Sequence, residues 1–203
     1  MQKIIAQATS LFFHPLLVPT YAILLLLNLP THHFMVLPPK YRYLIALLVF
    51  LTTFVLPSLI FVIMKRFNAL KSLQMHERRE RVLPLIIVAV FFYTTYFLLK
   101  QNEHNSIITL FMLGATMLVL LSLIVNYFTK ISIHTASWGG LAGALAGFSL
   151  NFNVDVMPWL YVVVLLAGVV GAARLLLNAH TAFQVYLGFL VGSITQLLLF
   201  FLI

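Results

Sequence analysis

The sequence contains no cysteine and few acidic residues. Without cysteine, the chain has neither disulfide bonds nor thiolate ligands for a metal ion. Only four of the 203 residues are Asp or Glu, and none of them lies deep in an apolar segment. The chain therefore lacks the buried carboxylates of a proton relay, which makes a transporter or channel the weakest of the candidate function classes.

Positive charge is present, but its arrangement is not that of a nucleic-acid-binding protein. Twelve Lys and Arg residues give a formal net charge of +8. The chain has no long basic tail and no basic arm interleaved with aromatic residues. We therefore expect no nucleic acid partner, and anionic membrane lipid is the more natural one.

Apolar residues dominate the chain. They make up 63% of it, the mean hydropathy is +1.08, and about 20 apolar residues suffice for one helix to cross a bilayer. The sequence predicts an all-α fold, a polytopic transmembrane helical bundle that forms one domain over residues 1–203. The expected spans are residues 9–29, 42–64, 83–99, 106–127, 132–152, 156–176 and 181–202.

The first of these spans carries two alternatives. It is expected to be retained rather than cleaved as a signal peptide. Pro15 and Pro19 favour a kinked, interfacial or re-entrant segment. Six or seven spans are therefore expected.

The cations gather on one face of the membrane if the path alternates. With seven spans, nine cations share a face with the connections after the second, fourth and sixth spans, and three lie on the other. The positive-inside rule would make the first face cytoplasmic. When the five candidate ligand cations named below are set aside, the rule no longer decides the orientation. The first group is Lys3, Lys65, Arg66, Lys71, Arg78, Arg79, Arg81, Lys130 and Arg174; the second is Lys40, Arg42 and Lys100.

Two histidines lie at helix starts on the basic face. His134 follows Ser132 at the start of one span, and His180 opens another, six residues after Arg174. Unpaired N–H groups and the helix dipole favour anions at helix starts. His180 and Gln184 are four residues apart, so the Gln amide oxygen is able to accept the imidazole Nδ1–H. The other five histidines, His14 among them, are expected simply to lie at the membrane interface.

Small residues recur at four-residue spacing in the last spans. Gly139, Gly143 and Gly147 lie in one span, and Gly188 and Gly192 in another. Such residues let helix backbones approach closely in lipid. We therefore expect the last three spans to form one tight bundle, for which ordinary helix packing is a sufficient explanation.

These residues resemble the three motifs of the type-2 phosphatidic acid phosphatase superfamily. The stretch "ARLLLNAHTAFQ" resembles the third motif, Ser-Arg-x5-His-x3-Asp, and "ISIH" resembles the second, Pro-Ser-Gly-His. Lys71 with Arg78 resembles the first, Lys-x6-Arg-Pro, with Arg79 or Arg81 as substitutes for Arg78. The resemblance implies a family-like core over about residues 42–203 and a location in the bacterial inner (plasma) membrane.

The resemblance also implies roles for individual residues. His180 would be the nucleophile that forms a phosphohistidine, His134 the acid that protonates the leaving oxygen, and Gln184 the partner of His180. The phosphate would be held by Lys71, Arg78, Arg79, Arg81, Ser132 and Arg174, without a metal or cofactor. The implied substrates are lipid phosphates or diphosphates, such as phosphatidic acid or an isoprenoid diphosphate.

The chain departs from the motifs at several positions. Ile131 and Ile133 replace the Pro and Gly of the second motif, Ala173 replaces the Ser of the third, and Gln184 replaces its Asp. Two functions therefore remain open. One is hydrolysis of a lipid phosphate, and the other is a weakened or inactive member that binds lipid phosphate or serves as a subunit of a membrane complex, with a protein partner or as an oligomer.

Overall fold

All regular secondary structure in the described part of the chain is helical, as predicted. The computed structural model describes residues 1–29, 31–35, 37–67, 78–101 and 106–201. The elements are α1 (Gln2–Phe12), α2 (Val18–Leu27), α3 (His32–Met35), α4 (Pro39–Phe50), η1 (Leu51–Val55), α5 (Leu56–Arg66), η2 (Arg79–Arg81), α6 (Val82–Lys100), α7 (Ser106–Phe128), α8 (Ile133–Phe152), α9 (Met157–Leu176) and α10 (Ala182–Phe201).

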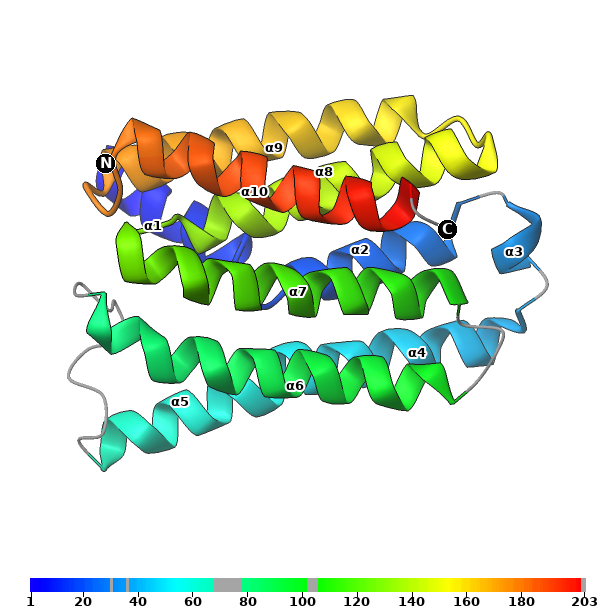
Figure 1. Cartoon of the computed structure of the whole chain (residues 1–203), viewed down its shortest axis with the longest axis horizontal. Helices are drawn as coiled ribbons and strands as arrows, with labels where there is room; N and C mark the ends of the chain where they lie inside the picture. The colour runs from blue at the N-terminus through cyan, green and yellow to red at the C-terminus, as the bar shows by residue number, and fades with distance from the viewer. Residues whose placement is uncertain (30, 36, 68–77, 102–105, 202–203) are drawn as a thin grey trace.

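Five helical stretches within these residues are long and apolar enough to cross a membrane. They are Pro39–Arg66, Arg79–Lys100, Ser106–Phe128, Met157–Leu176 and Ala182–Phe201. The first joins α4, the π-helical η1 and α5 into one 28-residue helix. Five of the predicted spans correspond to these stretches, and the long helices run side by side along the molecule (Figure 1). The chain is therefore organised as an integral membrane protein.

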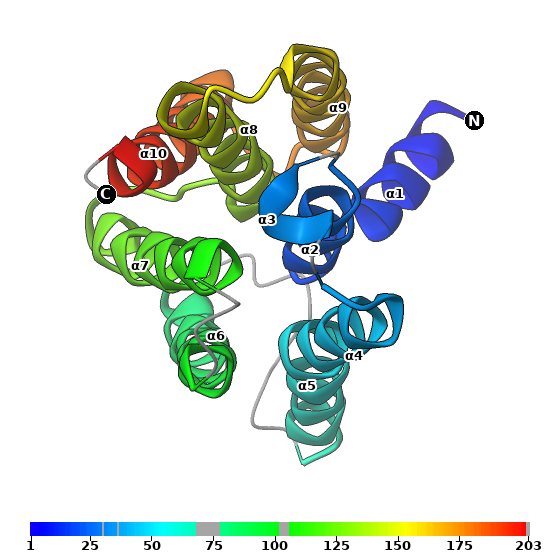
Figure 2. The ribbon, with the colours of Figure 1, turned by 90° about the vertical axis from the view of Figure 1, so that its right-hand side faces the viewer.

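The predicted span over residues 9–29 is not a single helix. The chain turns at residues 13–17, between α1 and α2, and α2 is only 10 residues long. Pro15 lies in this turn and Pro19 in the first turn of α2, where a missing N–H costs least. The break that the two prolines predict is thus confirmed, and α1 lies at the edge of the bundle (Figure 2).

The predicted helix over residues 132–152 forms as α8, but it is less apolar than the five spanning candidates. Twelve of its 20 residues are buried. Seen along the bundle, α8 lies among α2, α9 and α10 (Figure 2). Because protein surrounds most of its surface, its glycines contact α7 and α10 instead of acyl chains.

The pairing of α8 with α10 is the most extensive helix contact among the described elements. A Cβ atom on Gly143 would overlap the backbone of Ser193, and one on Gly192 would overlap the carbonyl of Ala136. The hydroxyl of Ser193 also donates to the carbonyl of Gly139 at 3.1 Å. The predicted close approach of these two spans is therefore confirmed, and it requires glycine at these contacts.

Candidate functional site

The parallel pairing of α8 and α10 brings two predicted motifs together. The N–H of Ser132 donates to the carbonyl of Gln184 at 3.3 Å, and the Thr135 hydroxyl donates to the carbonyl of Val185 at 2.9 Å. The first turns of both helices therefore lie side by side, at the end of the bundle where α9 finishes (Figure 1). His134 and His180 line the same cavity there, which has a volume of about 840 Å³.

The loop between Arg174 and His180 has a defined conformation. Asn178 is left-handed, with φ of 51°. The N–H of Ala179 donates to the carbonyl of Arg174 at 3.1 Å, and the N–H of Asn178 donates to that of Leu175 at 2.9 Å. This is the Schellman arrangement that ends many helices. It turns the chain so that Arg174 and His180 both line the cavity.

Thr181 and Gln184 form a capping box at the start of α10. The N–H of Gln184 donates to the Thr181 hydroxyl at 3.4 Å, and the N–H of Thr181 donates to Gln184 Oε1 at 3.3 Å. The same Oε1 lies 3.0 Å from Nδ1 of His180. Because an amide oxygen only accepts hydrogen bonds, Nδ1 carries the proton and Nε2 of the neutral ring has a free lone pair.

The environment of His180 keeps its imidazole neutral. The residue is only 9% exposed. Burial, with the nearby Arg81 cation next in weight, lowers the pKa of His180 to about 4 against the opposing hydrogen bond to Gln184. At neutral pH the side chain is therefore an uncharged imidazole with Nε2 available as a nucleophile.

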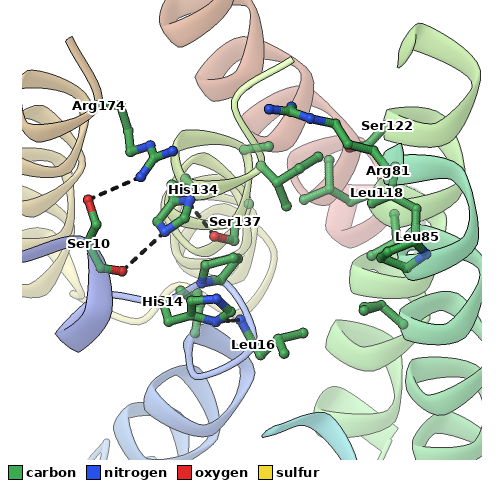
Figure 3. A pocket seen from close by; sticks show the side chains of 18 of the residues that line it. Ser10, His14, Leu16, Arg81, Leu85, Leu118, Ser122, His134, Ser137 and Arg174 are labelled. Carbon is green, nitrogen blue, oxygen red and sulfur yellow. Dashed lines mark hydrogen bonds between the residues drawn. The ribbon is translucent and has the colours of Figure 1, made fainter. Parts of the chain in front are cut away.

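Ser10, at the end of α1, contacts both Arg174 and His134 (Figure 3). Nη1 of Arg174 donates to the Ser10 hydroxyl at 3.3 Å, while Nε of Arg174 is buried and has no hydrogen-bond partner among the described residues. Nε2 of His134 lies 3.1 Å from the Ser10 carbonyl. A carbonyl only accepts, so Nε2 of His134 carries a proton.

The cavity is cationic on several sides. Arg81 reaches into it from the start of α6, opposite Arg174 (Figure 3), and donates from Nη1 to the carbonyl of Ile131 at 3.1 Å. Lys3 and Lys130 also line it. Among the described residues that line the cavity, none is Asp or Glu. The charged side chains in the described part of the cavity wall are therefore all basic.

Another part of the cavity wall is apolar. Leu85 and Phe92 of α6 and Phe111 and Ala115 of α7 line it. Gln196 of α10 also does so, 14 residues beyond the start of that helix, which is about 20 Å at 1.5 Å per residue. The cavity therefore extends from the cationic end deep between the helices.

Not all predicted site residues meet in this cavity. Four of them line it, namely Arg81, His134, Arg174 and His180. Gln184 does not line it but accepts a hydrogen bond from Nδ1 of His180. Lys71 lies outside the described residues.

Three predicted phosphate ligands have other positions. Arg79 is exposed and does not line the cavity. Arg78 donates to the carbonyls of Tyr127 and Phe128 at the end of α7, at 3.3 and 2.8 Å. Ser132 is fully buried, and its hydroxyl accepts from the N–H of Thr135 at 3.5 Å as the N-cap of α8. It is therefore a structural cap, as Ser often is at a helix start.

Ser10 and His14 are cavity residues that the sequence did not reveal. His14 was expected at the interface, but its ring lies edge-on to that of His134, with 5.5 Å between centroids. The only signal was local: a polar pair beside Pro15 in an otherwise apolar stretch.

No family model, curated protein or solved structure matches the chain.

Proposed function

We propose that this protein is a membrane lipid phosphatase or diphosphatase related to the type-2 phosphatidic acid phosphatases, acting in the bacterial inner membrane. In this proposal residues 42–203 form the family-like core. Six segments cross the bilayer, namely the five long apolar stretches and α8. The observation that carries the proposal is the cationic cavity, lined by His134 and His180, whose described wall has no acidic residue.

The charge in the cavity supports an anionic ligand. Within the described part of the chain, Nε of Arg174 is a buried donor without a partner, and leaving such a group unpaired costs about 1–3 kcal/mol or more. A phosphate oxygen would remove this cost, and Arg side chains bind phosphate in a bidentate manner, through two N–H groups at once. The anion would also lie near Arg81 and Lys130, which line the same cavity.

The apolar wall supports a lipid as the carrier of that anion. A volume of about 840 Å³ lies within the usual range for small-molecule sites, roughly 300–1,000 Å³. With the phosphate at Arg174, an acyl or isoprenoid chain would extend past Leu85 and Phe92. Burial of that chain would add affinity through the hydrophobic effect.

The proposed chemistry uses the two imidazoles in turn. Nε2 of His180 attacks phosphorus, a P–N bond forms, and the P–O bond to the lipid breaks. His134 acts here as an imidazolium, which the bound phosphate dianion favours; the leaving oxygen takes its Nε2 proton and leaves a neutral imidazole. Water then attacks the phosphohistidine, giving its proton back to His134, and the P–N bond breaks to release phosphate. Arg81 and Arg174 stabilise the charge on the transferred group.

One contact must change before His134 acts as the acid. Its Nε2 proton is directed at the Ser10 carbonyl, 3.1 Å away. In the proposed reaction the leaving oxygen takes the place of that carbonyl. The Ser10 carbonyl therefore keeps a proton on Nε2 of His134 until substrate arrives.

A second candidate function is binding without hydrolysis, as a lipid-phosphate-binding protein or a subunit of a membrane complex. Gln184 favours it, because a neutral amide orients His180 but does not stabilise its positive form. The cationic wall would still hold the ligand. Both functions share the site and differ in turnover.

Phosphate release from purified protein tests the proposal. Wild type is expected to release phosphate from phosphatidic acid or an isoprenoid diphosphate, and His180→Ala to lose more than about a thousand-fold in rate. Lipid-phosphate affinity should survive His180→Ala but fall about a hundred-fold in Arg174→Ala. Arg79→Ala is the matched control, because Arg79 is exposed outside the cavity.

The outcomes separate the two functions. Equal turnover in wild type and His180→Ala would refute the phosphohistidine mechanism. Binding without phosphate release from any of these lipids would support the second candidate. Equal affinity in the Arg174→Ala and Arg79→Ala variants would refute both.

A further inference from the structure

The turn between α1 and α2 contributes a third imidazole to the cavity. His14 lines the cavity beside His134 and Arg174, and its ring meets that of His134 edge-on at 80°. Figure 3 shows His14 below His134, with Arg174 above. A residue from a broken apolar segment thus lies within the same cluster as the two helix-start motifs.

The tautomer of His14 is fixed by the backbone. The N–H of Leu16 donates to Nδ1 of His14 at 3.3 Å. Nδ1 therefore carries no proton, and the proton of the neutral ring is on Nε2. No acceptor for that proton is found among the described residues, so His14 has an unused donor in a cavity wall.

The turn is held in place from several sides. The Phe13 carbonyl accepts from Nε1 of Trp138 on α8 at 3.3 Å, and the Leu16 carbonyl accepts from the Thr53 hydroxyl of η1 at 3.2 Å. Ser10, just before the turn, contacts Arg174 and His134. These contacts from three other elements fix the position of His14 relative to the cationic groups.

We propose that His14 is a further phosphate-binding residue. Its neutral Nε2–H donates to an oxygen of a phosphate group that lies between Arg174 and the imidazoles of His134 and His180. This inference rests on the proposed function, because it assumes that the cavity holds a phosphate group. The ligand class is any phosphate monoester or inorganic phosphate. The α1–α2 turn would then form one wall of the site.

Two substitutions separate the donor from the fold. In His14→Asn the side-chain oxygen takes the place of Nδ1 and keeps the Leu16 contact, but nothing replaces Nε2–H. In His14→Gln the longer amide places an N–H near the position of Nε2. If His14 donates to phosphate, the Asn variant should bind at least about tenfold more weakly and the Gln variant within about threefold of wild type.

The measurement is titration calorimetry of the full chain in detergent with inorganic phosphate and, separately, with a short-chain phosphatidic acid. A short-chain diacylglycerol without phosphate is the blank. The same fold-change for both phosphate ligands identifies the shared oxygen as the group that His14 contacts. Unfolding temperatures of both variants are recorded alongside.

The outcomes distinguish this inference from the proposed function. If wild type binds and His14→Asn binds equally well, the role of His14 is refuted and the proposed function stands. If both variants weaken alike and unfold at lower temperature, His14 is structural and the inference is refuted. If wild type binds neither phosphate ligand, the proposed function is refuted and the role of His14 with it.

Discussion

Oε1 of Gln184 accepts hydrogen bonds from two neighbours, Nδ1 of His180 at 3.0 Å and the N–H of Thr181 at 3.3 Å. One side chain therefore both begins α10 and orients the imidazole. An amide at this position therefore still makes both hydrogen bonds, although the motif that the sequence resembles has an Asp carboxylate there. It also determines which substitutions at this position are informative.

Gln184→Glu should increase turnover by about tenfold or more. Glu has the length of Gln and is an equally good capping-box residue, so α10 should begin unchanged. Its carboxylate favours the protonated imidazole, which raises the pKa of His180 above about 4 and stabilises positive charge on the ring. Steady-state phosphate release measures the gain.

Gln184→Ala is the comparison variant for that experiment. It removes both hydrogen bonds of Oε1 and should lower the unfolding temperature as well as the rate. A Glu variant that is no faster than wild type would contradict the idea that the missing carboxylate limits turnover.

The low pKa of His180 predicts how stability depends on pH. The folded chain holds His180 neutral down to about pH 4, whereas the unfolded side chain takes up a proton near pH 6.5. The unfolded state therefore binds more protons between these values, and stability falls as the pH is lowered through this window. The unfolding temperature of His180→Gln should fall less than that of wild type between pH 7 and pH 4.5.

The same pKa predicts the acid limit of the proposed reaction. Because the proposed mechanism uses neutral His180 as the nucleophile, the rate should be retained below pH 6 and decline near pH 4. A rate that already halves near pH 6.5 would show that His180 titrates normally in the working protein.

Asn178 should tolerate Gly but not Val. Its left-handed conformation, with φ of 51°, suits Gly and Asn, whereas a β-branched residue is strained there by about 1–2 kcal/mol. Asn178→Val should therefore unfold at lower temperature and bind lipid phosphate less tightly, because Arg174 and His180 flank this turn. Asn178→Gly should match wild type in both measurements, and equal behaviour of the two variants would contradict this account.

Gly143 and Gly168 should respond in opposite ways to Ala. A Cβ on Gly143 would overlap the backbone of Ser193, whereas one on Gly168 would meet nothing within 4 Å. Gly143→Ala should cost about 1–3 kcal/mol and separate α8 from α10. Gly168→Ala should be neutral or stabilising, by up to about 1 kcal/mol. Unfolding of both variants in detergent measures the contrast.

The sequence predicted the long helices well because each is an apolar run of membrane length. It also predicted the α8–α10 contact, since glycine at four-residue spacing marks close helix packing. It did not define the path of residues 9–29, although Pro15 and Pro19 indicated a break. Proline identifies where a helix stops, but not where the next one packs.

The site was predictable only where short motifs fixed local geometry. Arg174, His180 and Gln184 are linked by one turn and one capping box, so their spacing in sequence carries over into space. From sequence, Ser132 as a helix cap was not distinguishable from Ser132 as a phosphate ligand, because both roles use the same hydroxyl at the start of the helix. His14 was missed since its place depends on contacts with α8 and η1, more than thirty residues away.

The modest apolarity of α8 also bears on how the protein is made. Its sequence, rich in Gly and Ala, gives a newly synthesised segment little tendency to enter a bilayer alone. The glycine-lined face of α8 is fully packed only when α10, which is translated later, lies against it. We therefore expect insertion of α8 to be coupled to its neighbours during biogenesis, so that the two imidazoles at the helix starts meet only once the final hairpin has been translated.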